Sequence, residues 1–189
     1  RSHTVAMESP TYKQAYRVLA GQGVKVCPVG MDSRGMRVDA LEASGADIAY
    51  VMPSHQFPTG IVMPVRRRQE LLQWACRREG RFLIEDDYDS EFRYKGKPVP
   101  ALQGMGREDK VIYLGTFSQS IAAAIRISYM VLPPALLELY RERAGFYAST
   151  VSRIDQNILY QFLVKGHFER HLNRMRSVYR EKHDSLLAA

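Results

Sequence analysis

The 189-residue sequence lacks most features of small secreted, metal-binding or membrane-spanning proteins. Its only two cysteines, Cys27 and Cys76, provide neither a disulfide framework nor a metal-ligand spacing. No apolar run approaches the ~20 residues that a membrane span requires, and no secretory signal opens the chain. These absences predict a cytoplasmic protein with no membrane partner.

A strong composition bias is also missing. With 46% hydrophobic and 25% charged residues, the chain is an ordinary globular domain. Its net charge of +7, from 27 Lys+Arg against 20 Asp+Glu, suits nucleic acid, an anionic ligand or mere solubility. Because the basic residues are dispersed and not grouped around aromatic side chains, we do not expect this segment itself to contact nucleic acid.

Short apolar runs alternate with amphipathic stretches, a pattern typical of a mostly parallel sheet flanked by helices, so the predicted fold class is α/β. Helical patterns cover residues 11–20, 65–78 and 135–143. Residues 152–189 read as a long arginine-rich helix interrupted at Gly166. Residues 1–150 are therefore predicted to form the sheet domain, and residues 151–189 a connector. The expected strands are 4–7, 24–29, 48–52, 82–85, 111–116 and 127–132.

Polar segments directly after three of these strands are the places to look for a site, because open α/β sheets bind ligands at the carboxyl ends of their strands. The first segment, residues 53–60, contains His55 and ends in Pro58-Thr59-Gly60. It is either a ligand loop or a plain turn with a structural histidine.

The second segment is acidic. Residues 84–92 hold five acidic side chains at the end of an apolar strand, and their mutual repulsion predicts a cationic or protonated partner. A metal ranks below a cationic organic ligand, because no histidine lies close in sequence and no glycine is placed to form a calcium loop. A solvated acidic turn is the alternative.

The third segment, residues 113–126, runs from a strand into small and hydroxyl residues and reaches Arg126. Neutral donors with a single planar cation suit a phosphate group. The same residues are also compatible with a small-residue loop and one structural arginine.

Together these segments resemble a known family. The large domain of fold-type-I pyridoxal-phosphate aminotransferases, and more closely the aminotransferase-like domain of MocR-type regulators in the GntR superfamily, is similar to this chain nearly end to end. The strings that carry the resemblance, in order, are PSHQFPTG (53–60), IEDDYDSEF (84–92), YLGTFSQS (113–120), IRISYMVLP (125–133) and GHFERHLNRMRSVY (166–179).

The resemblance implies a role for each candidate residue. Asp86 pairs with the protonated pyridine nitrogen of pyridoxal 5'-phosphate, and Tyr88 hydrogen-bonds the ring hydroxyl. The family tyrosine near the cofactor corresponds to Tyr12. The phosphate cradle consists of Thr116, Ser118 and Arg126.

Two departures from the family pattern limit the expected chemistry. Phe57 stands where aminotransferases usually carry asparagine, which favours the regulator branch. Gln119 occupies the position of the Schiff-base lysine, and a carboxamide nitrogen is not a nucleophile. Cofactor binding is therefore expected to be non-covalent at best, without turnover. Lys95, Lys97 and Lys110 lie in a polar loop or just before a strand, and nothing in their position suggests that they substitute for the missing lysine.

The predicted function is effector sensing in a MocR-type transcriptional regulator, with pyridoxal phosphate and a small amino compound as ligands. By resemblance the domain is incomplete at both ends, DNA binding belongs to a missing N-terminal domain, and a homodimer is expected. The alternatives are an aminotransferase whose lysine has been replaced, and a ligand-free dimerisation scaffold.

Overall fold

The computed structural model describes residues 3–92, 99–106 and 109–188, and within them a single seven-stranded sheet. Lys95 and Lys97 lie outside the described residues. The strand order is β3-β2-β1-β4-β5-β6-β7. The bounds are Thr4–Ser9 for β1, Lys25–Asp32 for β2, Gly35–Met36 for β3, Ile48–Val51 for β4, Phe82–Asp87 for β5, Val111–Thr116 for β6 and Ser128–Val131 for β7.

Five neighbouring strands, from β2 to β6, run parallel, and β3 and β7 are antiparallel edge strands. The predicted α/β class and mostly parallel sheet are confirmed, and each expected strand is present within a few residues of its predicted bounds. The sequence reading missed β3, because two residues are too short to show a periodicity.

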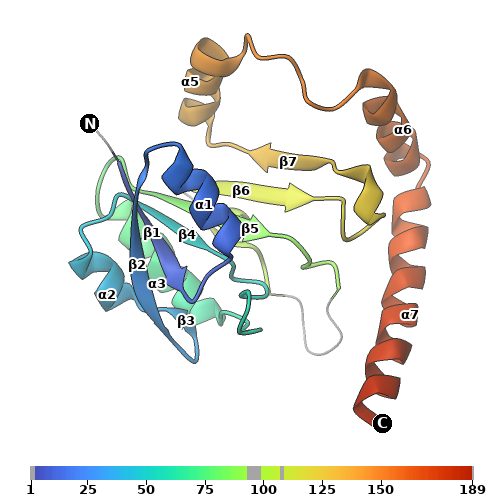
Figure 1. The fold of residues 1–189 in the computed structure, drawn as a ribbon, viewed down its shortest axis with the longest axis horizontal. Helices are drawn as coiled ribbons and strands as arrows, with labels where there is room; N and C mark the ends of the chain where they lie inside the picture. Colours follow the sequence, from blue (N-terminus) through green and yellow to red (C-terminus); the bar gives the residue numbers. More distant parts are fainter. Residues whose placement is uncertain (1–2, 93–98, 107–108, 189) are drawn as a thin grey trace.

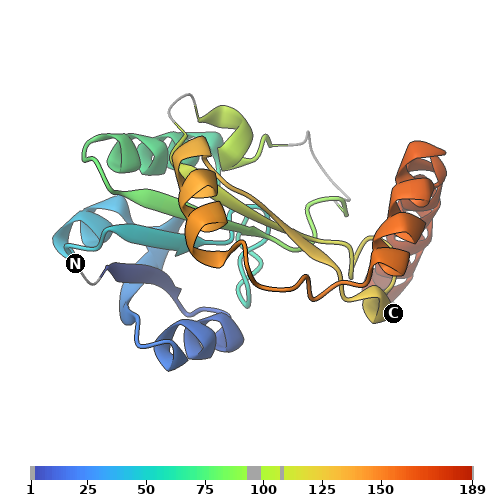
Figure 2. The same cartoon turned by 90° about the horizontal axis from the view of Figure 1, so that it is seen from above.

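Helices cover both faces of the sheet. In Figures 1 and 2, α1 lies on one face and α3 on the other. The sequence reading missed α2 and α4, which are only six and four residues long. The bounds are Lys13–Gly21 for α1, Val38–Ala43 for α2, Val65–Cys76 for α3, Leu102–Met105 for α4, Ala123–Ile125 for the 3-10 helix η1, Pro134–Ala144 for α5, Arg153–Val164 for α6 and His167–Ala188 for α7.

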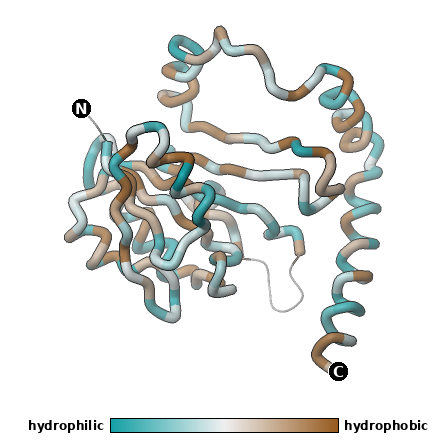
Figure 3. The backbone as a smooth tube through the Cα atoms, viewed as in Figure 1, coloured by the Kyte–Doolittle hydropathy of each residue, from teal (hydrophilic) through white to brown (hydrophobic). Residues whose placement is uncertain are grey.

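Each face of the sheet has its own hydrophobic core. The larger cluster joins Leu71 and Trp74 of α3 to strand residues such as Leu83, and the smaller one contains Met7 and Tyr50 on the side of α1. Figure 3 shows hydrophobic stretches along the strands and also in α5 and α6, whereas α7 alternates along most of its length. Because strand side chains alternate between faces, neighbours in one strand serve different cores.

The predicted break at Gly166 separates α6 from α7, and Gly166 has a left-handed backbone with φ of +66°. One side of α7 then lies against the loops that follow β5 and β6. The ring of Phe168 meets Phe117 edge to face at 6.0 Å, and Arg176 Nε donates to the Glu91 carbonyl at 2.8 Å. Across the described part of the chain, no helix is both long and apolar enough to cross a membrane.

Candidate functional site

The site lies where β4, β5 and β6 end. These three strands are adjacent and parallel, so the segments that follow them lie at one edge of the sheet. These are the three polar segments that the sequence pattern singled out. The strand register pairs Val51 of β4 with Glu85 of β5, and Asp86 of β5 with Leu114 of β6. The carboxyl ends of the three strands therefore lie side by side.

Asp86 is the best-defined polar group at this edge. Its carboxylate accepts a short hydrogen bond from the Tyr50 hydroxyl of the neighbouring strand. Burial raises the pKa of Asp86, the Tyr50 bond lowers it, and the charges of Asp87 and Asp89 raise it further. The buried Asp86 carboxylate would therefore be stabilised by a hydrogen bond from a protonated, basic partner.

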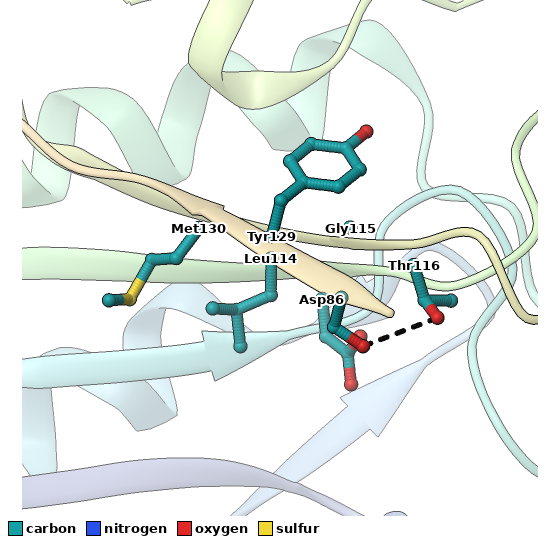
Figure 4. A pocket seen from close by; sticks show the side chains of 7 residues that line it. Asp86, Leu114, Gly115, Thr116, Tyr129 and Met130 are labelled. Carbon is teal, nitrogen blue, oxygen red and sulfur yellow. Dashed lines mark hydrogen bonds between the residues drawn. The ribbon is translucent and has the colours of Figure 1, made fainter. Parts of the chain in front are cut away.

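A cavity of about 350 Å³ opens beside Asp86. Of the residues predicted for the site, Asp86 and Thr116 line it, and Figure 4 shows them close together while the Tyr129 ring projects to the other side of the strands. The dashed line in Figure 4 is the bond of 3.3 Å that the Ser128 hydroxyl donates to Thr116 Oγ1. The complete lining consists of Asp86, Leu114, Gly115, Thr116, Ser128, Tyr129 and Met130.

The loop after β6 is organised by Thr116. Its hydroxyl donates to the Ile127 carbonyl at 3.3 Å and accepts from the Ser118 amide at 3.2 Å. Arg126 ends η1 in a left-handed conformation with φ of +48°. Its exposed guanidinium makes no hydrogen bond or ion pair with the residues that the structure describes, so this cation is available to an anionic ligand.

The acidic segment is not one cluster. Strand alternation sends Asp86 to the face of α1 and its neighbours Glu85 and Asp87 to the opposite face. Glu85 accepts from the Leu102 amide at 2.9 Å, and Asp87 accepts from the Tyr113 hydroxyl at 2.7 Å. The repulsion predicted from the sequence is therefore relieved mainly by separate internal partners.

The remaining predicted residues are not among those that line the cavity; they are Tyr12, Tyr88, Ser118, Gln119 and Arg126. Tyr12 precedes α1, is 44% exposed and meets Phe57 edge to face at 5.8 Å. Tyr88 shares the face of Asp86 and packs on the smaller core. Gln119 is exposed in the loop after β6. Lys110, for which no role at the site was expected, places its ammonium 5.4 Å from the ring centroid of Phe82, at the opposite end of β5 from Asp86.

The sequence reading missed Tyr50, Gln56 and Ser128. Gln56 is buried and holds the loop after β4 together, donating to the Pro10 carbonyl at 2.9 Å and accepting from the Thr59 amide at 3.2 Å. A polar residue inside an apolar strand, as Tyr50 is, was the available signal. The contact of Gln56 with Pro10 joins segments 46 residues apart, and that of Ser128 with Thr116 joins two strands, so neither partner could be read from the local sequence.

A mostly parallel sheet with an acidic residue and a hydroxyl cradle at its carboxyl edge defines a class of protein: the chain belongs to the aminotransferase class I and II family, whose model matches residues 1–189. Within that family the chain is similar to regulators. It is 41% identical to the uncharacterized HTH-type transcriptional regulator YdeL of Bacillus subtilis over 98% of its length, and 35% identical to the probable rhizopine catabolism regulatory protein MocR of Rhizobium meliloti over 96%.

Solved structures give the same fold. The α-aminoadipate aminotransferase LysN of Thermus thermophilus, crystallised with N-(5'-phosphopyridoxyl)-L-leucine, matches 100% of the chain with a TM-score of 0.83 and 31% identity. The resemblance to the aminotransferase-like domain of MocR-type regulators is thereby confirmed. The chain spans 40% of YdeL, 37% of MocR and 50% of LysN.

Proposed function

We propose that this chain is the effector-sensing domain of a transcriptional regulator, binding pyridoxal 5'-phosphate without covalent attachment and without transamination. The observation that carries the proposal is the cavity that Asp86 and Thr116 both line. Its volume of about 350 Å³ lies within the range of small-molecule sites.

The donor set fits this cofactor. Asp86 would hold the ring nitrogen, because a buried carboxyl with a raised pKa readily shares a proton with a pyridine. Ser118 and Arg126, whose guanidinium has no partner among the described residues, would hold the phosphate, and Thr116 would join them by turning toward it the proton that it now donates to the Ile127 carbonyl. Tyr88 would contact the ring hydroxyl. When bound, the cofactor supplies an aldehyde for amino compounds and an electron-withdrawing ring.

Gln119 is the reason to propose a sensor. Its carboxamide cannot act as a nucleophile or shuttle a proton, and its side chain is exposed. The similarity to YdeL and MocR supports the same choice. We propose that DNA binding belongs to a helix-turn-helix segment of the full protein, that residues 151–189 connect the sheet domain to a further part, and that the protein acts as a homodimer in the cytoplasm.

Titration with pyridoxal phosphate, followed by absorption and calorimetry, tests the proposal. Asp86→Asn keeps an acceptor for Tyr50 but loses the charge, and should weaken binding about 10- to 150-fold, the worth of a hydrogen bond between charged groups. The exposed Asp39→Asn, which faces Arg37, is the matched control and should leave binding unchanged. Absence of binding by the unaltered protein would refute the proposal.

The alternative function, an aminotransferase with a replaced lysine, is favoured by the fold shared with LysN. Gln119→Lys separates the two functions. A sensor should give little keto acid from any amino acid tested, whereas steady turnover would establish the enzyme.

A further inference from the structure

The Asp86 carboxylate is held by a side chain of the neighbouring strand, Tyr50 of β4. Among the described residues, the Tyr50 hydroxyl is the one hydrogen-bond donor to Asp86, and it reaches Oδ2. The other carboxylate oxygen, Oδ1, has no hydrogen-bond partner in the described part of the chain, and Asp86 is one of the residues that line the cavity. The protein thus occupies one oxygen, and the other is available to a ligand.

Packing fixes the position of the Tyr50 hydroxyl. The residue is 4% exposed, and its ring lies in the smaller core with Met7 and Met52. The strand register places Tyr50 opposite Ile84, which is two residues before Asp86 and therefore on the same face of β5. A tyrosine hydroxyl has a single proton to donate, and here the Asp86 carboxylate receives it. The buried ring therefore fixes the donor and, through it, the carboxylate oxygen that it holds.

The Tyr50 hydroxyl keeps its proton at neutral pH. Burial raises the pKa of Tyr50, and the negative charge of Asp86 and the hydrogen bond to it raise it further. The titratable groups that act on Tyr50 from other elements, Glu8 of β1 and Tyr12 before α1, shift its pKa in the same direction. Tyr50 is therefore a neutral donor to Asp86 throughout the range in which carboxyl groups titrate.

Tyr50 is also the described group that favours the charged form of Asp86. Burial raises the pKa of Asp86, and the hydrogen bond from Tyr50 lowers it. The charges of Asp87, on the same strand, and Asp89, in the following loop, raise it again. A carboxylate can pair with a protonated pyridine nitrogen, whereas an uncharged carboxyl group loses that ionic attraction. Without the Tyr50 hydroxyl, the burial of Asp86 and both neighbouring charges would all favour the uncharged form.

We infer that Tyr50 is a positioning residue, which holds Asp86 as an oriented carboxylate so that the site selects ligands whose ring nitrogen carries a proton. This inference rests on the proposed function for its ligand, and adds to it a residue that acts through Asp86. The hold of Tyr50 on Asp86 is a property of the protein alone and is tested without ligand.

The ligand-free test is a pH titration of the Asp86 carboxyl carbon by NMR, with its signal identified by its loss in Asp86→Asn. Tyr50→Phe keeps the ring in the core and removes the hydroxyl. It should move the Asp86 midpoint to higher pH by about one to two pH units, the worth of a hydrogen bond to a charged group. Tyr113→Phe is the matched control, because it removes a tyrosine–aspartate bond of 2.7 Å on the opposite face of the sheet and should not raise the midpoint. Equal midpoints in the unaltered protein and in Tyr50→Phe would overturn the inference.

The ligand test measures affinity from acidic to neutral pH for pyridoxine 5'-phosphate, which has the ring nitrogen and phosphate but no aldehyde to react with lysines. Affinity should fall on the acid side as Asp86 gains its proton, and in Tyr50→Phe this fall should begin at a pH that is higher by the same amount as the midpoint. Asp86→Asn shows the part of the pH dependence that belongs to the ligand phosphate, which titrates in the same range. A uniform loss of affinity in Tyr50→Phe, with the fall at its original pH, would show a merely structural role and overturn the inference.

A double-mutant cycle shows whether Tyr50 acts through Asp86. Tyr50→Phe should weaken binding at mildly acidic pH in the unaltered protein and have no further effect in the Asp86→Asn background; equal effects in both backgrounds would overturn the inference. Nitrogen NMR of the bound ligand should show a protonated ring nitrogen, and an unprotonated one would overturn the selectivity. Failure of the unaltered protein to bind pyridoxine phosphate would remove the proposed function and the selectivity with it, while the Asp86 titration still decides the positioning role of Tyr50.

Discussion

Arg68 offers the most direct test of how the site is held in place. Its guanidinium is fully buried and donates to the carbonyls of Pro53 and Met63, at 2.7 and 3.0 Å, which lie at the two ends of the loop after β4. It also donates to the Pro100 carbonyl at 2.9 Å and lies 3.9 Å from Glu85. One side chain therefore fastens the loop that carries His55.

Replacing Arg68 with methionine keeps much of the volume and removes every one of these bonds. Three carbonyls and a buried carboxyl lose a partner, and removal of one member of a buried pair typically costs about 3–5 kcal/mol. With a urea dependence of about 2 kcal/mol per M for a domain of this size, the unfolding midpoint should fall by roughly 1.5–2.5 M.

Trp74 provides the assay, because it is the single tryptophan and is fully buried on the inner face of α3. Urea unfolding followed by its fluorescence should show the predicted shift in Arg68→Met. Arg66→Met is the matched control: this side chain is 83% exposed and faces Glu70 at 3.4 Å, so its loss should cost at most about 0.5 kcal/mol. A shift in Arg68→Met no larger than that of the control would refute the reasoning.

Two further predictions concern Glu8 and Gly115. Burial raises the pKa of Glu8 from 4.5 to about 7, so the folded protein holds this proton to higher pH than the unfolded chain. This difference contributes about 3 kcal/mol to the free energy of unfolding below pH 4.5, and the contribution is lost as the pH rises through 7. Urea midpoints measured across this pH window should therefore change less in Glu8→Gln than in the unaltered protein. At Gly115 an added Cβ would lie 2.3 Å from Tyr129 Cζ, so Gly115→Ala should lower the free energy of unfolding by about 1–3 kcal/mol. In a Tyr129→Ala background the same change should be nearly neutral, and an undiminished cost there would show that the ring is not the obstacle.

The order of elements was readable from the sequence because parallel strands buried on both faces are continuous apolar runs. The run at 111–116, which forms β6, is an example. The break at Gly166 was readable for a different reason, because a glycine interrupts the helical pattern there. The position of the site was readable for a similar reason, since a polar residue such as Asp86 directly after such a run must lie at the carboxyl edge of the sheet.

The partners of those residues were decided only by the tertiary structure. Nothing local to Tyr50 or Asp89 says that the first bonds Asp86 and the second bonds His55, because each contact joins segments more than 30 residues apart through the strand order β4-β5-β6. By itself the sequence determined that the chain has an α/β sheet with hydroxyl and acidic residues at one edge, and that Gln119 cannot act as a nucleophile. Strand pairing and side-chain alternation decided which acids share a face and in which direction the Tyr50 proton points, because these depend on three-dimensional neighbours.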